Sequence, residues 1–207
     1  MVETRRQQIE HAASVLFRER GYTATSVRDI AQVLNLQGAS LYAHVASKED
    51  LLWSIVERAA DRFEAAVAPI AVADGPAPER LRSMVRAHIG VVTDDLGNAV
   101  SFLDEWRFLS PERRTAVAAR RRRYERRFRQ VISQGIAAGD FKPGTDPRLA
   151  ATWMLSALNG IAVWYRPDGD LQPEAIADRY ADLFLGGLTC PPDRLDLPPD
   201  SPRRTDS

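Results

Sequence analysis

The stretch that decides the fold is GYTATSVRDIAQVLNLQGASLYAHVASKEDLL, residues 21–52. Its opening glycine suits the left-handed position that ends a helix, and Ser26 can cap a second helix. The apolar residues of that second helix recur at helical spacing: Val27, Ile30, Ala31 and Leu34. Asn35, which tolerates a sharp turn, precedes a short third segment at residues 37–44. A capping box at 47–50, SKED, then opens a long helix, so the stretch predicts two short helices joined by a turn.

Helical spacing extends to both sides of this stretch. The apolar stripe before it is Ile9, Ala12, Ala13, Leu16 and Phe17, and the one after it is Leu51, Leu52, Ile55, Val56, Ala59, Phe63 and Ala66. Pro and Gly residues separate further helices. These are expected over 79–95, over 99–109, from 111 to Gly135 or Gly139, from 147 and from 173. Gly97 and Asn98 are expected to form the break before the helix at 99–109. We find no period-two pattern and no repeat.

These patterns predict an all-α protein of about nine helices. A helix-turn-helix domain is expected over residues 1–50 and a helical domain over 51–189. Residues 190–207 contain five prolines and no apolar stripe, which predicts a disordered tail.

Composition and charge limit the kinds of function that the chain can have. The 207 residues carry 44% hydrophobic and 27% charged side chains, as in ordinary globular proteins. A net charge of zero means that any nucleic-acid partner must be argued from local charge. The single Cys excludes an internal disulfide, no Cys/His spacing suits zinc, and no cofactor motif occurs. Neither a signal peptide nor a membrane span is expected, so the reducing cytoplasm is the predicted location.

The helix-turn-helix predicts binding to double-stranded DNA. In this motif the second short helix enters the major groove while neighbouring groups hold phosphates. Tyr42, His44 and Lys48 are suitable donors, and the start of the next helix adds backbone N–H groups. Residues 1–50 contain six basic and six acidic side chains, yet no acid lies between Ile30 and Lys48. Singly, Tyr42 and His44 also suit a surface aromatic and a solvated turn; the motif favours DNA contact.

The same stretch resembles the N-terminal domain of the tetracycline repressor (TetR) family of transcription regulators, over residues 5–60. Gly-Tyr, Thr-Ser-Val-x-Asp-Ile-Ala, Ser-Leu-Tyr and Ser-Lys-Glu-Asp-Leu carry the resemblance. It implies a homodimeric repressor that binds a palindromic operator and is released by a small-molecule effector. On the family pattern the residues at the DNA are Thr25, Arg28, Gln37, Ala39, Ser40, Tyr42, His44 and Lys48. The first two lie on the DNA side of the second helix, the next three approach bases, and the last three hold phosphates.

Four positions depart from the family pattern. Gln37 replaces a short capping side chain but can bond adenine with two hydrogen bonds. Gly38 removes a side chain that could read a base, and Ala39 stands where glycine is frequent. Val45 replaces the usual Phe in the small domain's core. These changes bear on the operator sequence and leave the mode of binding as expected. Arg5 and Arg6 suit either a minor-groove arm or a solvated terminus.

The last two helices predict how the chain assembles. LAATWMLSALNGIAVWY, residues 149–165, is apolar almost all round, as in a helix buried on every side. The final helix carries an apolar face of Ile176, Tyr180, Leu183, Phe184 and Gly187. Together they suit a four-helix bundle across a two-fold axis, that is, a homodimer. The alternative is that the first of them is the central helix of a monomer.

Residues 112–129 pose a separate question, because nine arginines stand there against two acids. A solvated or ion-paired face is the favoured interpretation, and a second nucleic-acid surface or an anionic-ligand site are alternatives. Residues 157–188 resemble a TetR subgroup of regulators of fatty-acid and sterol catabolism, which respond to acyl-coenzyme A thioesters. That resemblance implies an acyl groove with arginines near the phosphates, lined by Phe102, Trp106, Trp153 and Trp164. The alternative is that these rings simply belong to the core.

Two other function classes were weighed. Catalysis is not indicated, because no triad spacing, phosphate loop or carboxylate cluster frames the three histidines. His88 suits a hydrogen-bonded core position better than a ligand pocket. A helical adaptor that docks an acidic partner through the arginine-rich helix is the alternative, and it leaves Gln37, Tyr42, His44 and Lys48 without a role. The sequence therefore predicts a ligand-responsive, DNA-binding regulator.

Overall fold

The computed structural model describes residues 4–37 and 41–189. Within them the chain forms eight α-helices and one 3₁₀ helix, and no strand. The helices are α1 (Arg5–Arg20), α2 (Val27–Val33), α4 (Lys48–Ala71), α5 (Ala77–Asp94), α6 (Leu96–Leu103), η1 (Glu105–Phe108), α7 (Pro111–Ala138), α8 (Pro147–Trp164) and α9 (Pro173–Leu188). The all-α prediction is confirmed. The tail at 190–207, expected to be disordered, lies outside the described residues.

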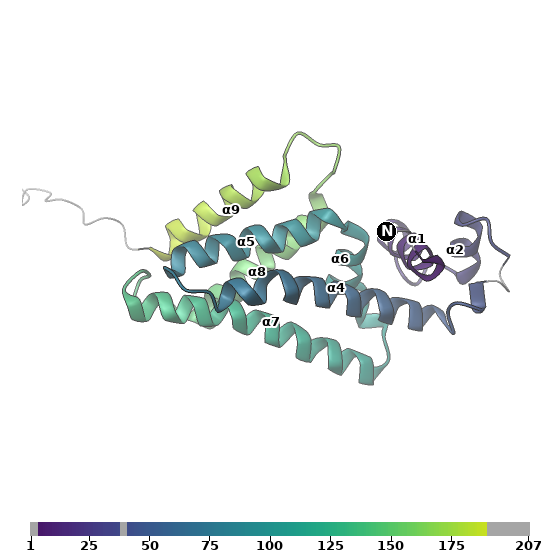
Figure 1. The fold of residues 1–207 in the computed structure, drawn as a ribbon, viewed down its shortest axis with the longest axis horizontal. Helices are drawn as coiled ribbons and strands as arrows, with labels where there is room; N and C mark the ends of the chain where they lie inside the picture. Colours follow the sequence, from purple (N-terminus) through teal and green to yellow (C-terminus); the bar gives the residue numbers. More distant parts are fainter. Residues whose placement is uncertain (1–3, 38–40, 190–207) are drawn as a thin grey trace, which may run out of the picture.

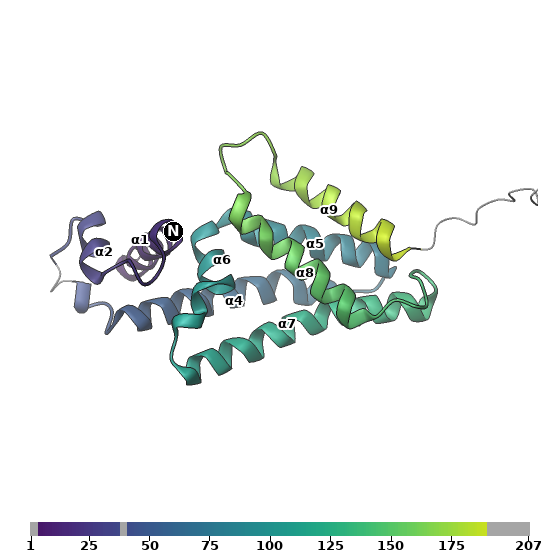
Figure 2. The same cartoon turned by 180° about the vertical axis from the view of Figure 1, so that it is seen from behind.

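The long helix α4 organises the molecule. The short helices α1 and α2 lie at one of its ends, α5, α6 and α7 pack along the rest, and α8 packs on α5 and α7 (Figure 1). The view from behind shows α8 running obliquely over the bundle with α9 beside α5 (Figure 2). The expected domain boundary at residue 50 falls inside α4, so one continuous helix serves both parts. No helix among the described residues has the length and apolarity needed to cross a bilayer.

Local signals in the N-terminal stretch produce the expected structure. The five stripe residues of α1 are buried, and Ser26 caps α2 with Asp29 bonding back to its N–H at 2.7 Å. Gly21 ends α1 with φ 82° and ψ 154°, a positive-φ conformation other than the expected left-handed helical one. Asn35 adopts φ 51°, as the sharp turn requires.

The expected third helix, residues 37–44, includes residues 38–40, which lie outside the described residues. On either side of this gap, Leu41 N–H donates to the Gln37 carbonyl at 3.3 Å and Val45 N–H donates to the Leu41 carbonyl at 3.1 Å. Leu41 and Val45 are both buried in the core of the small domain. These bonds have the i to i+4 spacing of a helix.

The expected break at Gly97 and Asn98 is wrong. Both residues lie inside α6, whose N-cap Asp95 accepts from Asn98 N–H at 3.1 Å. A Cβ on Gly97 would meet Ser14 Oγ at 2.8 Å, so glycine here lets α6 cross closely over α1. The sixth segment therefore starts earlier than predicted and is divided, since α6 ends at Leu103 and η1 follows.

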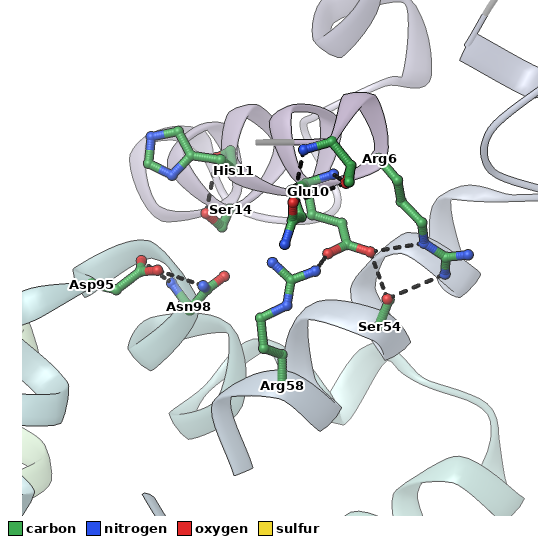
Figure 3. A network of polar contacts seen from close by, with 10 residues as sticks. Arg6, Glu10, His11, Ser14, Ser54, Arg58, Asp95 and Asn98 are labelled. Carbon is green, nitrogen blue, oxygen red and sulfur yellow. Dashed lines mark hydrogen bonds and ion pairs between the residues drawn. The ribbon is translucent and has the colours of Figure 1, made fainter. Parts of the chain in front are cut away.

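A buried carboxylate fastens α1 to α4. Glu10 of α1 is almost fully buried, and Figure 3 shows it surrounded by Arg6, Ser54 and Arg58. Ser54 Oγ donates to Glu10 Oε1 at 2.7 Å, Arg6 Nε donates to the same oxygen at 3.0 Å, and Arg58 pairs with the other oxygen. Ser54 and Arg58 belong to α4, so the small domain is held to the long helix by charge as well as by apolar packing.

Removing one partner tests this attachment. Arg58→Met should lower the free energy of unfolding by about 3 kcal/mol, because it leaves a buried carboxylate with Arg6 as its only cation. Glu10→Gln should cost less, since the negative charge itself is gone and both arginines, which are partly exposed, return to water. Urea denaturation of the two variants gives the comparison. A cost for Glu10→Gln equal to or above that of Arg58→Met contradicts the argument.

Candidate nucleic-acid interface and ligand cavity

Four of the predicted DNA-contacting residues present their side chains to solvent. Arg28, Gln37, Tyr42 and His44 are exposed, with 57% of the Tyr42 surface accessible. They stand on α2 and on the connection to α4, at the end of the molecule farthest from the C-terminal end of α9 (Figure 1). The expected base contacts of Ala39 and Ser40 fall outside the described residues.

The side chain of Thr25, also predicted to lie at the DNA, points into the small domain. Thr25 is buried, and its hydroxyl donates inward to the Gly21 carbonyl at 2.9 Å and the Leu16 carbonyl at 3.3 Å. The hydroxyl thereby satisfies carbonyls at the end of α1. Thr25 fixes the loop between α1 and α2 and does not offer its side chain to DNA.

Lys48 braces the same loop. Its Nζ donates to the carbonyls of Tyr22 and Thr25, both at 2.9 Å, and lies 4.2 Å from the centre of the Tyr22 ring. Partial burial lowers the pKa of the Lys48 ammonium. Since an ammonium has three donors, one N–H remains beyond these two bonds. Phosphate contact by Lys48 stays a prediction, and its internal role in positioning the loop is an addition to it.

The first turn of α4 is bonded to the first turn of α7. Ser47 caps α4 by accepting from Asp50 N–H at 3.0 Å, and its hydroxyl donates to the Asp50 carboxylate at 2.7 Å. The second carboxylate, Glu49, accepts from Ser110 N–H at 3.0 Å. Arg113 contacts both acids, Glu49 at 3.2 Å and Asp50 at 2.5 Å. The bond from Ser110 N–H is the main reason why the pKa of Glu49 is lowered, and for Asp50 it is the Ser47 hydroxyl followed by Arg113.

A second link joins η1 to the small domain. The ring of Phe108 stacks on that of Tyr22 with centroids 5.6 Å apart and planes at 21°. Tyr22 is the residue whose carbonyl Lys48 holds. Residues 105–113, which we call the η1–α7 bridge, therefore contact both the loop between α1 and α2, at Tyr22, and the first turn of α4.

A cavity of about 210 Å³ lies among α4, α5, α6, α7 and α8. Its wall includes the aromatic rings of Phe63 and Phe102, and four cavity residues lie on one face of α8: Thr152, Leu155, Ser156 and Asn159. Of the four lining residues predicted from the sequence, only Phe102 lines this cavity.

Trp153 and Trp164 do not line this cavity. The four α8 residues that line it recur at helical spacing, which places Trp153 on another face. Trp153 is 50% exposed and meets Phe184 of α9 edge-on at 4.9 Å, and Trp164 is 41% exposed. Trp106 is half-buried and lies under the Arg121 guanidinium, 5.5 Å from its ring centre, next to the lining residues.

The cavity contains one buried polar pair that sequence reasoning placed only in the core. His88 of α5 and Tyr124 of α7 are joined by a hydrogen bond of 2.9 Å between Nδ1 and the phenol oxygen. Burial lowers the pKa of His88 to about 3 and raises that of Tyr124 well above its usual value. Within the described part of the chain, His88 Nε2 has no hydrogen-bond partner. Its place on the apolar stripe of α5 was visible in the sequence, but the partner on α7 was not.

Arg121 connects the cavity to α6. Its Nη1 donates to the Phe102 carbonyl at 2.9 Å and to the Leu103 carbonyl at 3.3 Å, which are among the last of α6. The guanidinium also lies 5.4 Å from the Phe102 ring centre, and burial lowers its pKa. Because the last carbonyls of a helix lack partners within it, Arg121 acts as a C-terminal cap from a neighbouring helix.

The arginines of α7 fall into two sets, those that bond to groups within the chain and the rest, some of which are exposed. Arg113, Arg121, Arg120 and Arg127 bond inward, the last two to Asp61 and Glu64 of α4. This supports the ion-paired interpretation for those residues. The others include Arg122 and Arg123, which are exposed, and Arg122 lines the cavity. No group of three or more potential metal ligands occurs in residues 4–37 and 41–189.

Both α8 and α9 leave apolar side chains uncovered in the single chain. Ala151, Met154, Leu158 and Ile161 are buried, so α8 is not enclosed on every side as its composition predicted. Its other faces carry Leu149, Trp153, Val163 and Trp164, all exposed, and Leu183 on α9 is 71% exposed. Large exposed apolar groups on neighbouring helices are typical of an interaction surface.

Comparison with known proteins decides the family. Residues 9–55 match "Bacterial regulatory proteins, tetR family", and residues 74–188 match "Tetracyclin repressor-like, C-terminal domain". The chain belongs to the TetR family. It is a DNA-binding transcription regulator with an N-terminal helix-turn-helix domain and a C-terminal helical domain.

Two relatives are informative. The chain is 30% identical to the HTH-type transcriptional repressor KstR2 of Mycobacterium tuberculosis, over 91% of this chain and 94% of that protein. The solved structure of that ketosteroid transcriptional regulator superposes with a TM-score of 0.87, covering 92% of this chain and 98% of that one. AibR, solved in complex with isovaleryl coenzyme A and operator DNA, is 32% identical, with a TM-score of 0.78 over 87% of this chain and 97% of AibR.

The burial of His88 predicts how stability depends on pH. Because its pKa falls from 6.5 to about 3 on folding, the unfolded chain binds a proton between these values that the folded chain does not. The free energy of unfolding should therefore decrease as the pH drops below 6.5, with a slope approaching 1.4 kcal/mol per pH unit from this group. Urea denaturation from pH 7.5 to about pH 5 measures the slope. His88→Phe should reduce it, and His11→Phe, which replaces an exposed histidine, should retain it; equal slopes in both variants contradict the assignment.

Proposed function

We propose that this regulator is a homodimeric repressor that binds a palindromic operator and is released by an acyl-coenzyme A thioester. One observation carries the proposal: the η1–α7 bridge contacts Tyr22 and the first turn of α4, and the same helix α7 supplies Arg121 and Arg122 to the wall of the cavity. The name of the M. tuberculosis relative supports repression, and the AibR complex supports the class of effector. Such a protein works at the chromosome, in the cytoplasm, and no catalytic step is proposed for it.

In the proposed complex, residues 37–44 enter the major groove. Gln37 contacts a base, with Ala39 and Ser40 beside it, while Tyr42, His44 and the third N–H of Lys48 hold phosphates. Arg28 contacts the DNA from α2. The exposure of Arg28, Gln37, Tyr42 and His44 supports this arrangement. Two such units, spaced about 34 Å or a multiple apart by dimerisation, match successive faces of the groove.

The effector acts through Arg121 in this proposal. Arg121 and Arg122 line the cavity, and guanidinium groups bind phosphate or carboxylate oxygens well. A ligand that draws Arg121 from the Phe102 and Leu103 carbonyls removes the cap of α6, and η1 begins two residues after α6 ends. The resulting movement of η1 takes the protein from its DNA-binding state to a second state. Operator affinity falls by the difference between the ligand's affinities for these two states.

Dimerisation is assigned to α8 and α9. The exposed Leu149, Trp153, Val163 and Leu183 support this, because a second copy of the same surface covers them in a four-helix bundle. The adaptor hypothesis is not favoured, since four of the arginines on α7 are occupied by groups within the chain.

Selection from random-sequence DNA tests the proposal. The purified full chain, at about 150 mM salt, should enrich a palindrome, and acyl-coenzyme A esters should displace the protein from it while free coenzyme A should not. A palindrome unaffected by every ester would retain the DNA-binding function and eliminate this effector class. Absence of any enriched sequence would eliminate sequence-specific repression.

Two variants then separate phosphate contact from base contact on the selected palindrome. Lys48→Ala should weaken binding to all sequences and reduce the slope of log affinity against log salt by about one. Gln37→Ala should cost about 1–3 kcal/mol at a single base position and leave the salt slope unchanged. Because Lys48 also braces the loop, circular dichroism of both variants serves as the folding control. Equal losses on every sequence for both variants contradict the division of roles.

A single charge placed on α9 tests the dimer surface. Leu183→Glu buries a carboxylate in the proposed interface and should shift the protein toward the 23.1 kDa monomer, raising the dissociation constant at least about tenfold. Light scattering after gel filtration measures the mass. Val33→Glu is the matched control, because Val33 is 56% exposed on α2, outside that surface, and the variant should remain dimeric. A dimeric Leu183→Glu would exclude this part of α9 from the interface.

A further inference from the structure

The cavity holds a hydrogen-bonding group that the proposed function has not used. His88 is buried, lines the cavity, and has its Nδ1 bonded to the Tyr124 hydroxyl at 2.9 Å. Among the described residues nothing bonds to its Nε2. A buried polar atom without a partner costs free energy, so such an atom on a cavity wall indicates a place for a ligand's polar group.

The tautomer of His88 determines which kind of ligand group can bond to Nε2. If the Tyr124 hydroxyl donates to Nδ1, the phenol hydrogen is satisfied and Nε2 carries the remaining N–H. If Nδ1 donates instead, the phenol hydrogen and Nε2 both need partners elsewhere, and this hydrogen bond is the only one that the structure describes for the Tyr124 hydroxyl. The first tautomer leaves fewer unsatisfied groups. Nε2–H is then a neutral donor, whose natural partner is a carbonyl oxygen.

The volume of the cavity limits the size of the group. At roughly 30 Å³ for each methylene- or water-sized unit, 210 Å³ accommodates about seven such units. A branched acyl group of five carbons with its carbonyl oxygen fits within that number. A fused-ring steroid nucleus exceeds that number and would extend beyond the cavity. Phe63, Phe102 and Leu155 supply apolar contacts for the carbons.

We infer that His88 and Tyr124 form a binding site for the carbonyl oxygen of a short acyl thioester. The acyl chain lies against Phe63 and Phe102, whose rings contact each other on the cavity wall, and the coenzyme A portion leaves toward Arg121 and Arg122 on α7. This inference rests on the proposed function and specifies its ligand: a short-chain acyl group, in contrast to the ketosteroid named for the structural relative from M. tuberculosis. His88 selects the thioester, and the cavity wall selects the chain length.

A pair of matched ligands tests the hydrogen bond on the unaltered protein. Isovaleryl-coenzyme A and its thioether analogue, S-(3-methylbutyl)-coenzyme A, have the same carbon skeleton and differ in the carbonyl oxygen alone. Titration calorimetry of the full-length dimer should give an affinity roughly tenfold higher for the ester. Equal affinities overturn the inference without any mutation being made.

His88→Phe completes the comparison. The variant should lose the preference for the ester, while His11→Phe, the same change at an exposed position, should keep the tenfold ratio. If His88→Phe does not fold, Tyr124→Phe replaces it, because loss of the hydroxyl frees the imidazole to adopt either tautomer and should reduce the ratio. A ratio that persists in His88→Phe overturns the inference.

The second part of the test varies the length of the acyl group. Isovaleryl- and hexanoyl-coenzyme A should bind, whereas hexadecanoyl-coenzyme A and the coenzyme A ester of a steroid acid should bind at least tenfold more weakly. Tighter binding of the long or steroidal esters overturns the assignment of a short acyl group. If no ester of any length binds while the palindrome is still recognised, the effector class fails and this inference fails with it. If esters bind without the carbonyl preference, only the inference about His88 fails.

Discussion

In the proposed mechanism, the two halves of this regulator communicate through the ion pairs that Arg113 makes with Glu49 and Asp50. They sit at the first turn of α4, beside the residues proposed to hold DNA phosphates. Two carboxylates at that position oppose the approach of phosphates unless a cation compensates them. Arg113 is supplied by α7, so the ligand-binding half neutralises the edge of the DNA-binding half. In the proposed mechanism, a displacement of the η1–α7 bridge changes charge as well as geometry at the DNA.

The buried Glu10 carboxylate makes that communication rigid. Its bonds to Ser54 and Arg58 attach α1 to α4, and Gly97 brings α6 against Ser14 of the same helix. A buried carboxylate tolerates little separation from its partners, because an unpaired charge inside a protein is costly. The small domain is therefore expected to move with α4 and α6 as one body, and a small shift of either helix changes the position of the reading segment.

The sequence predicted features that depend on neighbouring residues better than features that depend on distant ones. The caps at Ser26 and Ser47, the turn at Asn35 and the stripe of α1 were correct, since each is encoded within a few residues. Gly97 was misread as a break because its role depends on Ser14, more than eighty residues away. The resemblance implied that Trp153 and Trp164 line an acyl groove, and neither lines the cavity, because a resemblance in sequence does not show which face of α8 meets its neighbours. Thr25 shows the same limit, since its hydroxyl bonds inward to carbonyls at the end of α1.

The arginines of α7 show why a charge run cannot be assigned to one role. Arg113 compensates acids beside the DNA-binding loop, Arg120 and Arg127 pair with acids of α4, and Arg121 caps α6. These contacts recur about every two turns along one helix, and Arg113 and Arg121 are separated by roughly 12 Å along the axis. A ligand at Arg121 is therefore connected through one rigid helix to the ion pairs at Arg113. A second route runs from Arg121, through its hydrogen bonds to the Phe102 and Leu103 carbonyls, to η1, where Phe108 stacks on Tyr22 of the loop between α1 and α2. The first route ends at the first turn of α4 and the second at this loop, so in the proposed mechanism a ligand in the cavity acts on two elements of the small domain.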